Sequence, residues 1–374
     1  MNKNLKIAIW ILVVVLVAVT LIKTTYNKAS SQVVRIGAVL PLTGGLADLG
    51  NAQKQGMQLA VKELNAKSKT KYELMIEDGK AEPKSSLDSA NFLVSVKNAP
   101  IIITSFRGAS LSVASGLEKS KVVILAHTAT ADGSPVTKNG SNFIPMGAEM
   151  TNAGRSVGIY AKSNANCSAI GSVVEDTDAS KLKLAGFKDA FGTSIKYFEN
   201  LVPINSMDYR TIISKLKSEK VDCLYVEIRP NILTSFLKQA KELSFNPKKF
   251  SNSYAITVPL LEDNTFKDTL EGLVYSVNVL PNTQITNDFK TAFKAEYNKD
   301  ANDFSSLTYD FIHMIDSAVK TCGSTDNVCL AKTIRSNNPY TGVSGIMSFN
   351  EFGEGVQRDY VLKAISGGKF VDVK

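Results

Sequence analysis

Two short apolar runs in the first half of the chain, Ile101–Ile103 and Val122–Leu125, are each followed by small and hydroxyl-bearing residues. These residues are Thr104, Ser105, Gly108 and Ser110 after the first run, and Thr128, Thr130 and Ser134 after the second. Hydroxyl groups donate hydrogen bonds to polar ligands, and the guanidinium of Arg107 in the first loop adds a cationic donor that suits a carboxylate. The residue types therefore favour a binding site for a small polar molecule.

The two apolar runs predict neighbouring strands of a parallel sheet. Consecutive apolar residues suit strands that are buried on both faces, whereas half-exposed strands alternate apolar and polar residues. The segment Ser110–Lys119 between the runs is long enough for a crossover helix. Because loops at the carboxyl ends of parallel strands face the ligand crevice, we expect both hydroxyl-rich loops to line one site.

The length and composition of the chain predict a globular protein of two domains. Its 374 residues exceed what one hydrophobic core usually holds. The composition, 44% hydrophobic and 21% charged residues, suggests neither disorder nor low complexity. The formal net charge of +8 includes Lys3, Lys6, Lys23 and Lys28 beside an N-terminal apolar segment. Because the other lysines are scattered among acidic residues, we expect no nucleic-acid partner.

The N-terminal segment Ile7–Ile22 is an apolar run whose only hydroxyl group belongs to Thr20. It is long for a signal-peptide core and slightly short for a membrane span. The residues that follow offer no clean cleavage site, so residues 1–28 are interpreted as an uncleaved membrane anchor, with a cleaved signal peptide as the alternative. In both cases we expect an extracytoplasmic globular part, in the periplasm or at the cell surface, and an anchor would tether it to the cytoplasmic membrane through residues 7–22.

The four cysteines fit an exported protein. Cys322 and Cys329 enclose a polar turn between two helical stretches, which predicts a local disulfide. The only histidines of the chain, His127 and His313, give no metal-ligand pattern with these cysteines, so we expect no metal site. Cys167 and Cys223 each stand near the start of an apolar run, and the sequence leaves open whether they are buried thiols or a pair.

The order of predicted elements indicates two doubly wound α/β lobes. Strands over 33–40 and 72–78 and the two apolar runs alternate with helical segments, which is typical of a parallel sheet with helices on both faces. After a connection near Phe143–Thr151 the alternation starts again and predicts a second lobe. The last residues, 360–374, predict an exposed hairpin around Gly367 and Gly368. Two such lobes joined by short crossings predict a ligand cleft that closes about a hinge.

Several segments together resemble a known protein family. They are IGAVLPLTGGLADLGNAQKQGMQLAVKELN, IIITSFRGAS, ILAHTATADGS, DYRTIISKLKSEKVDCLYVEI, LTYDFIHMIDSAV and GVSGIMSFNEFGE. In order and spacing they look like extracytoplasmic solute-binding proteins of the leucine/isoleucine/valine-binding type, the receptors of ABC importers with the type I periplasmic-binding fold. The resemblance covers Val33–Lys374. It implies a first lobe of residues 33–148 plus 273–355 and a second lobe of residues 149–272 plus 356–374.

The resemblance also implies ligand-binding positions. Matched position by position, they are Leu49, Phe106, Arg107, Gly108, Thr128, Ala129, Thr130, Ser180, Arg229 and Tyr254. Thr128 and Thr130 match the family pattern, but Arg107 stands where family members hold the ligand carboxylate with a serine. The aromatic lid position falls near Ala179 or Ser180, and the acidic partner of a ligand ammonium falls at Tyr254.

Because of these differences, the chain lacks part of the residue pattern with which family members bind an amino acid. Arg107 with the threonine hydroxyls suits a carboxylate, whereas an ammonium group needs an acidic partner. The candidates at strand ends are Glu175, Asp176, Asp178 and Glu227. Arg107 and Arg229 from opposite lobes could instead hold an anionic ligand. We therefore expect an amino acid or a related carboxylate.

Three classes of function compete for this sequence. A receptor of an ABC importer predicts a small-molecule ligand, no catalytic residues, no cofactor and partners among permease and ATPase subunits. A ligand-sensing module that acts on a separate signalling partner is the alternative. An enzyme is not supported, because the histidines are far apart and no nucleophile, metal or dinucleotide motif is present. We expect a monomeric importer receptor.

Overall fold

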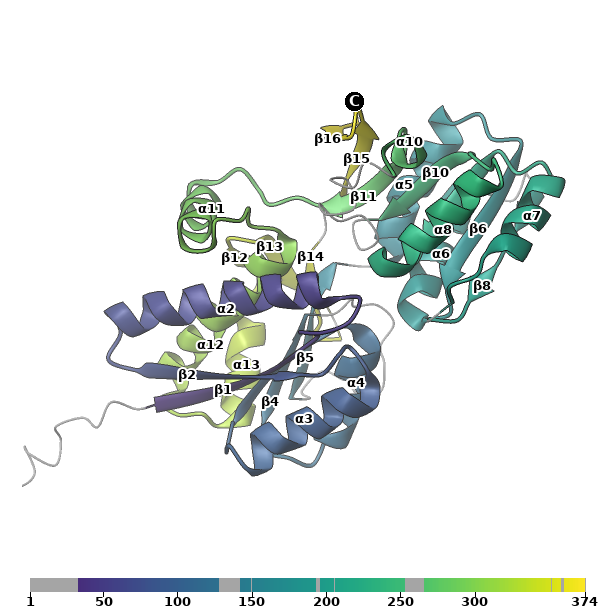
Figure 1. Cartoon of the computed structure of the whole chain (residues 1–374). Helices are drawn as coiled ribbons and strands as arrows, with labels where there is room; N and C mark the ends of the chain where they lie inside the picture. Colours follow the sequence, from purple (N-terminus) through teal and green to yellow (C-terminus); the bar gives the residue numbers. More distant parts are fainter. Residues whose placement is uncertain are drawn as a thin grey trace, which may run out of the picture.

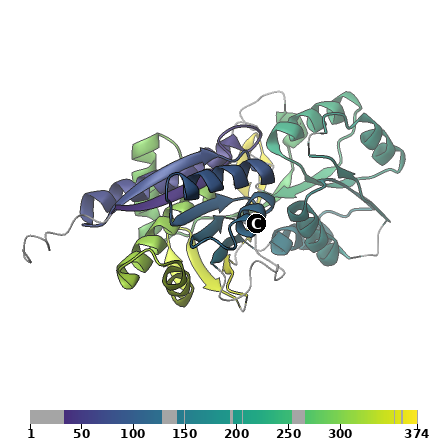
Figure 2. The ribbon, with the colours of Figure 1, turned by 90° about the horizontal axis from the view of Figure 1, so that it is seen from below.

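The computed structural model describes residues 33–127, 142–148, 150–192, 196–204, 206–252, 266–350, 352–357 and 360–373. These residues form two α/β lobes that lie next to each other, as both Figure 1 and Figure 2 show. This confirms the predicted fold class. No helix in these ranges is long and apolar enough to cross a membrane. The apolar segment 7–22 lies outside the described residues.

The first lobe contains an eight-stranded sheet in the order β12-β13-β14-β5-β4-β3-β1-β2. Its strands are β1 (Val33–Leu40), β2 (Lys71–Asp78), β3 (Ile101–Ser105), β4 (Val123–His127), β5 (Phe143–Ala148), β12 (Tyr340–Gly342), β13 (Gly345–Phe349) and β14 (Gly355–Gln357). Strands β1 to β5 run parallel, and β3 pairs Ile101 with Val123 of β4. The carboxyl ends of β3 and β4 therefore meet at one edge, as the sequence predicts.

Helices cover both faces of the first sheet (Figure 1). They are α2 (Ala47–Lys67), α12 (Asp303–Cys322) and α13 (Asn327–Ser336) on one face, and α3 (Pro83–Ser95) and α4 (Arg107–Gly116) on the other, while α11 (Gln284–Tyr297) packs beside α2. The apolar side chains of β1, β3 and β4 alternate between the two faces, so that Ile101 and Ile103 contact one helical layer and Ile102 the other. The consecutive apolar residues are explained by this burial on both sides.

The second lobe has the sheet order β16-β15-β11-β10-β9-β6-β7, with β8 paired to β6. Its strands are β6 (Ala169–Glu175), β7 (Lys196–Phe198), β8 (Leu201–Val202), β9 (Cys223–Glu227), β10 (Lys248–Asn252), β11 (Val274–Asn278), β15 (Tyr360–Ser366) and β16 (Lys369–Asp372). Its helices are α5 (Met150–Asn164), α6 (Asp178–Phe191), α7 (Arg210–Ser218), α8 (Pro230–Glu242) and α10 (Lys267–Leu270). The strands β15 and β16 form the predicted antiparallel hairpin, in which Ser366 pairs with Lys369.

The chain passes between the two sheets after Ala148, after Asn278 and after Gln357. Strand β11 pairs with β10 and β15 of the second sheet, so the second crossing follows Asn278. The family resemblance instead implies a crossing after Gly272. The third crossing follows Gln357, because β14 pairs with β5 of the first sheet. The difference arises because a strand shows its apolar pattern in the sequence but not the sheet it joins.

Other local predictions differ from the structure in three places. The expected connection at Phe143 begins with strand β5, whose apolar residues are buried between β4 and β14. Strand β10 was not predicted, since its sequence KKFSN is mostly polar and its position in the sheet supplies the burial. Helix α4 begins at Arg107, three residues before the expected Ser110, which places Arg107 in a helical turn.

Two disulfides are present. Cys322 and Cys329 form the predicted local bridge between the end of α12 and α13. Cys167 and Cys223 also pair, with a distance of 5.7 Å between their Cα atoms, and this bridge joins the segment before β6 to the start of β9. The sequence leaves open whether these two cysteines are buried thiols or a pair, and the structure shows a pair.

Candidate functional site

A cleft with a volume of about 380 Å³ is lined by residues of both lobes. The first lobe contributes Phe106 and Arg107 after β3, His127 at the end of β4, and Asp303 and Phe304 at the start of α12. The carboxyl ends of the parallel strands in the second lobe contribute the opposite wall. A volume in this range accommodates a small organic molecule.

Three aromatic side chains, Phe106, His127 and Phe304, lie close together in the first-lobe wall. The rings of Phe106 and Phe304 are stacked with centroids 6.2 Å apart, and the imidazole of His127 lies 4.9 Å from the ring of Phe304. Phe106 has a φ of 65°, an unusual backbone conformation for a residue with a side chain, at the position that caps helix α4. The turn from β3 into α4 thus presents a phenyl ring to the cleft, next to Arg107.

His127 is held as a neutral ring. The side-chain nitrogen of buried Gln53 lies 2.8 Å from Nδ1 of His127, and because an amide nitrogen can only donate, Nδ1 accepts and Nε2 carries the proton. Burial lowers the pKa of His127 to about 4. At neutral pH this residue therefore brings no positive charge to the cleft.

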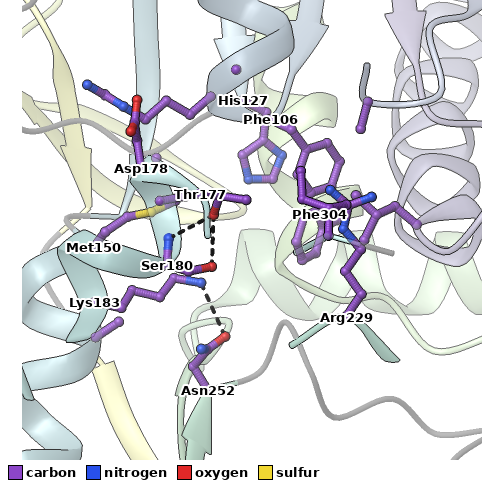
Figure 3. A pocket seen from close by; sticks show the side chains of 18 of the residues that line it. Phe106, His127, Met150, Thr177, Asp178, Ser180, Lys183, Arg229, Asn252 and Phe304 are labelled. Carbon is purple, nitrogen blue, oxygen red and sulfur yellow. Dashed lines mark hydrogen bonds between the residues drawn. The ribbon is translucent and has the colours of Figure 1, made fainter. Parts of the chain in front are cut away.

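The second-lobe wall is built around the first turn of α6 (Figure 3). The hydroxyl oxygen of Thr177 accepts a hydrogen bond from the backbone N–H of Ser180 at 3.1 Å and donates one to the hydroxyl of Ser180 at 2.9 Å. One turn later, Nζ of Lys183 contacts the carboxylate of Glu227 at 2.7 Å and the side-chain oxygen of Asn252 at 3.4 Å. The hydroxyls of this wall are thus fixed by a helix cap and its amine by a buried ion pair.

A second buried ion pair lies beside the first. Glu175, at the end of β6, accepts hydrogen bonds from the backbone N–H of Arg229 at 2.9 Å and from its Nε at 3.2 Å. Burial raises the pKa of Glu175 and of Glu227 above the ordinary value, while the paired cations oppose the shift. Both acids already have a protein cation as a partner, and Asp176 pairs with Lys181 at the exposed rim.

The structure brings about half of the predicted binding positions to the cleft. Phe106, Arg107, Gly108, Ser180 and Arg229 line it. Leu49 does not: it is buried in α2 and is not among the lining residues. Thr128, Ala129, Thr130 and Tyr254 lie outside the described residues.

Several other lining residues are not singled out by the sequence pattern, and five of them bear on the chemistry of the cleft. They are Thr177, Lys183, Asn252, Asp303 and Phe304. The threonine before a helical segment is a recognisable N-cap signal. Lys183 instead occupies an ordinary position in an amphipathic helix, and Asp303 follows a polar run before another helix, so neither pattern singles out a site. Within the described ranges, no group of three or more His, Cys, Asp or Glu residues could hold a metal ion.

Residues 33–369 match the family described as periplasmic binding protein. Leu/Ile/Val-binding protein homolog 3 of Brucella melitensis is 24% identical over 368 residues, which cover 93% of this chain and 96% of the relative. Among solved structures, the branched-chain amino acid transporter substrate binding protein LivJ of Streptococcus pneumoniae, in complex with isoleucine, has a TM-score of 0.81 at 20% identity and covers 91% of this chain and 98% of that one.

A solute binding protein of an ABC transporter from Rhodopseudomonas palustris BisB5, in complex with 3,4-dihydroxybenzoic acid, has a TM-score of 0.76 at 20% identity, with 91% of this chain and 96% of that chain covered. At these identities the structural likeness concerns the fold. The family match, in contrast, spans nearly the whole described chain. The chain therefore belongs to the periplasmic binding protein family, a family of extracytoplasmic substrate-binding receptors and not of enzymes.

Proposed function

We propose that this protein captures an amino acid or a related carboxylate by closure of the two lobes and delivers it to an ABC-type importer. The observation that carries the proposal is the cleft of about 380 Å³ whose lining comes from both lobes. The three crossings after Ala148, Asn278 and Gln357 would act as the hinge. A ligand that contacts both walls stabilises the closed form because it binds that form better than the open one.

The carboxylate end of the ligand is assigned to Arg107. Its position in the first turn of α4 combines a guanidinium with the end of a helix where N–H groups favour negative charge. Arg229 is a weaker candidate, since its Nε and its backbone N–H both serve Glu175. The molecules named with the two structural neighbours, isoleucine and 3,4-dihydroxybenzoic acid, share a carboxylate.

The wider setting follows the same proposal. The globular part acts as a monomer outside the cytoplasm, and the apolar segment 7–22 tethers it to the cytoplasmic membrane. The receptor then hands its ligand to permease and ATPase subunits. Delivery and tethering are supported by the family and by the sequence pattern of residues 1–28.

Calorimetric titration with a panel of amino acids and organic acids tests the function. We expect at least one carboxylate-bearing member to bind, and Arg107→Ala to weaken its binding at least tenfold, since a hydrogen bond to a charged group contributes about 1.5–3 kcal/mol. Arg155→Ala is the matched control, because Arg155 pairs with Asp189 at an exposed position outside the cleft. Binding of neutral ligands alone, with no effect of Arg107→Ala, would contradict the proposal.

A further inference from the structure

The charges in the cleft are not evenly balanced. On the second-lobe wall, Lys183 pairs with Glu227 and Arg229 with Glu175, so the deep charges there are compensated within the protein. On the first-lobe wall, the carboxylate of Asp303 lies at the start of α12 among the lining residues. Among the described residues, no cationic side chain forms an ion pair with Asp303.

Asp303 is not used as the cap of its helix. That role belongs to Asn302, whose side-chain oxygen accepts from the N–H of Ser305 at 3.0 Å, while the hydroxyl of Ser305 accepts from the N–H of Asn302 at 3.0 Å. This capping box satisfies the N–H groups of Asn302 and Ser305 without the carboxylate of Asp303. The acid is thus available for an interaction across the cleft.

The surroundings of Asp303 give it a strong preference for a cation. Its chain neighbour Phe304 stacks on Phe106 and makes a tilted contact with the ring of His127, which is neutral. Burial raises the pKa of Asp303 to about 6, although the backbone N–H of Phe304 opposes the shift. At pH 7 the group is therefore mostly ionised, and an ionised carboxylate beside an apolar wall gains most from a positive charge brought by a ligand.

We propose that Asp303 binds the cationic nitrogen of the ligand from the first lobe, beside the face of Phe304. This assignment rests on the proposed function and narrows its ligand to molecules that carry both an amino group and a carboxylate. It differs from the sequence-based candidates, because Glu175, Glu227 and Asp176 already pair with protein cations and Asp178 is exposed at the rim. The face of a phenyl ring adds a cation–π attraction to the same group.

Pairs of ligands that differ only in the amino group test the assignment. The probes are isoleucine with 3-methylpentanoic acid, leucine with 4-methylpentanoic acid, and phenylalanine with 3-phenylpropanoic acid, each titrated calorimetrically into the whole protein. We expect the wild type to bind the amino member of at least one pair at least tenfold more tightly. Asp303→Asn should weaken the binding of that amino member at least tenfold, and it should change the affinity for the deaminated acid less than threefold.

Two further variants separate a binding role from a structural one. Asp303→Glu keeps the charge and should retain part of the preference for the amino member. Asp189→Asn removes an exposed acid outside the cleft, where it pairs with Arg155, and it should leave the preference unchanged. If Asp303→Asn and Asp303→Glu both lose affinity equally for the two members of a pair, the role of Asp303 is structural and the assignment is overturned.

The remaining outcomes distinguish this assignment from the proposed function. Tight binding of the deaminated acids without a preference for the amino members would overturn the role of Asp303 and leave a carboxylate receptor intact. A preference that survives Asp303→Asn would do the same. If the wild type binds no member of the three pairs and none of the wider panel of amino acids and organic acids, the proposed function fails and the assignment fails with it.

Discussion

Nζ of Lys183 on α6 lies 2.7 Å from the carboxylate of Glu227 at the end of β9, and the Glu227 side chain is fully buried. The two residues are separated by 44 positions in the sequence. Asn252 from β10 is the third member of this contact. A buried charge pair of this kind gains little over an apolar core, but removal of one partner leaves the other charge in a poorly solvated place. The pair therefore ties a wall of the cleft to the strand behind it.

Replacement of Lys183 by methionine should lower the free energy of unfolding by about 3 kcal/mol, because Glu227 would lose its cation. The carboxyl already has a raised pKa from burial, and without Lys183 it is raised further. The folded variant then holds a proton that the unfolded chain releases at its ordinary pKa, so the loss should be larger at pH 8 than at pH 5. Urea unfolding at both pH values measures it.

The double variant Lys183→Met with Glu227→Gln should recover part of the loss and remove its pH dependence. Lys181→Met is the control, since its ion pair with Asp176 is exposed on the same helix and should leave the urea midpoint unchanged. If Lys183→Met loses the same stability at both pH values, the loss is not caused by a Glu227 carboxyl that lacks its cation.

The sequence predicts the buried strands of the first sheet well, but it does not predict the burial of Lys183. Ile101–Ile103 predict strand β3 correctly because burial on both faces of a sheet leaves a direct trace in consecutive apolar residues. Lys183 carries no such trace: it has the spacing of a surface lysine in α6, and its burial depends on a partner from a distant strand. The same holds for Asp303, whose position opposite the second lobe depends on the path of the chain after Asn278.

Local backbone geometry sets a second limit on prediction from sequence. The expected start of the crossover helix was Ser110, but the positive φ of Phe106 turns the chain into α4 at once. A phenylalanine has no propensity for this conformation, so no residue pattern announces the turn. Arg107 could be predicted as a loop residue near the site, but not as a residue in the first turn of a helix.

The neutral state of His127 predicts a dependence of stability on pH. Its pKa is lowered to about 4 in the folded protein, whereas an unfolded chain titrates near the ordinary value of about 6.5. Below about pH 6.5 the unfolded chain takes up a proton that the folded protein does not, so stability falls as the pH is lowered. Between pH 7.5 and pH 5 we expect this residue to account for a loss of about 1–2 kcal/mol.

Urea unfolding of the wild type and of His127→Asn at the two pH values isolates this contribution, because both proteins keep every other titrating group. The asparagine oxygen can still accept from Gln53. The loss between pH 7.5 and pH 5 should be smaller in the variant. An identical loss in both proteins would show that the folded protein does not lower the pKa of His127 and would contradict the prediction.

The backbone of Phe106 predicts an unusual ranking of two variants. Glycine adopts a positive φ without the steric cost that any side chain incurs, and such strain amounts to about 1–3 kcal/mol. Phe106→Gly should therefore be at least as stable as Phe106→Ala, although glycine is otherwise the more destabilising residue. Both variants lose the ring that stacks on Phe304 and should weaken ligand binding to a similar extent. Thermal unfolding and calorimetry compare them, and greater stability of the alanine variant would contradict the strain.

The packing of α5 against α6 predicts that a single methyl group would disturb the second-lobe wall. A Cβ atom at Gly154 would lie 1.8 Å from the carbonyl oxygen of Lys183, and one at Gly186 would lie 1.9 Å from that of Thr151. The two helices thus touch through their backbones, and Gly154→Ala must push them apart. Because α6 carries both Ser180 and Lys183 to the cleft, the variant should lose ligand affinity as well as about 1–3 kcal/mol of stability.

Gly108→Ala is the comparison for stability, since a Cβ atom there meets nothing nearer than 3.9 Å and alanine favours the helix that Gly108 occupies. It should match or exceed the stability of the wild type. Urea unfolding measures the stability of both variants, and calorimetry measures the ligand affinity of Gly154→Ala. Together they show whether the substitution affects only the packing of the two helices or also the binding residues that α6 carries. A stable Gly154→Ala protein with unchanged affinity would mean that α6 can move without moving the binding residues. Reduced affinity at a permissive temperature would show that the spacing of these two helices sets the geometry of the wall.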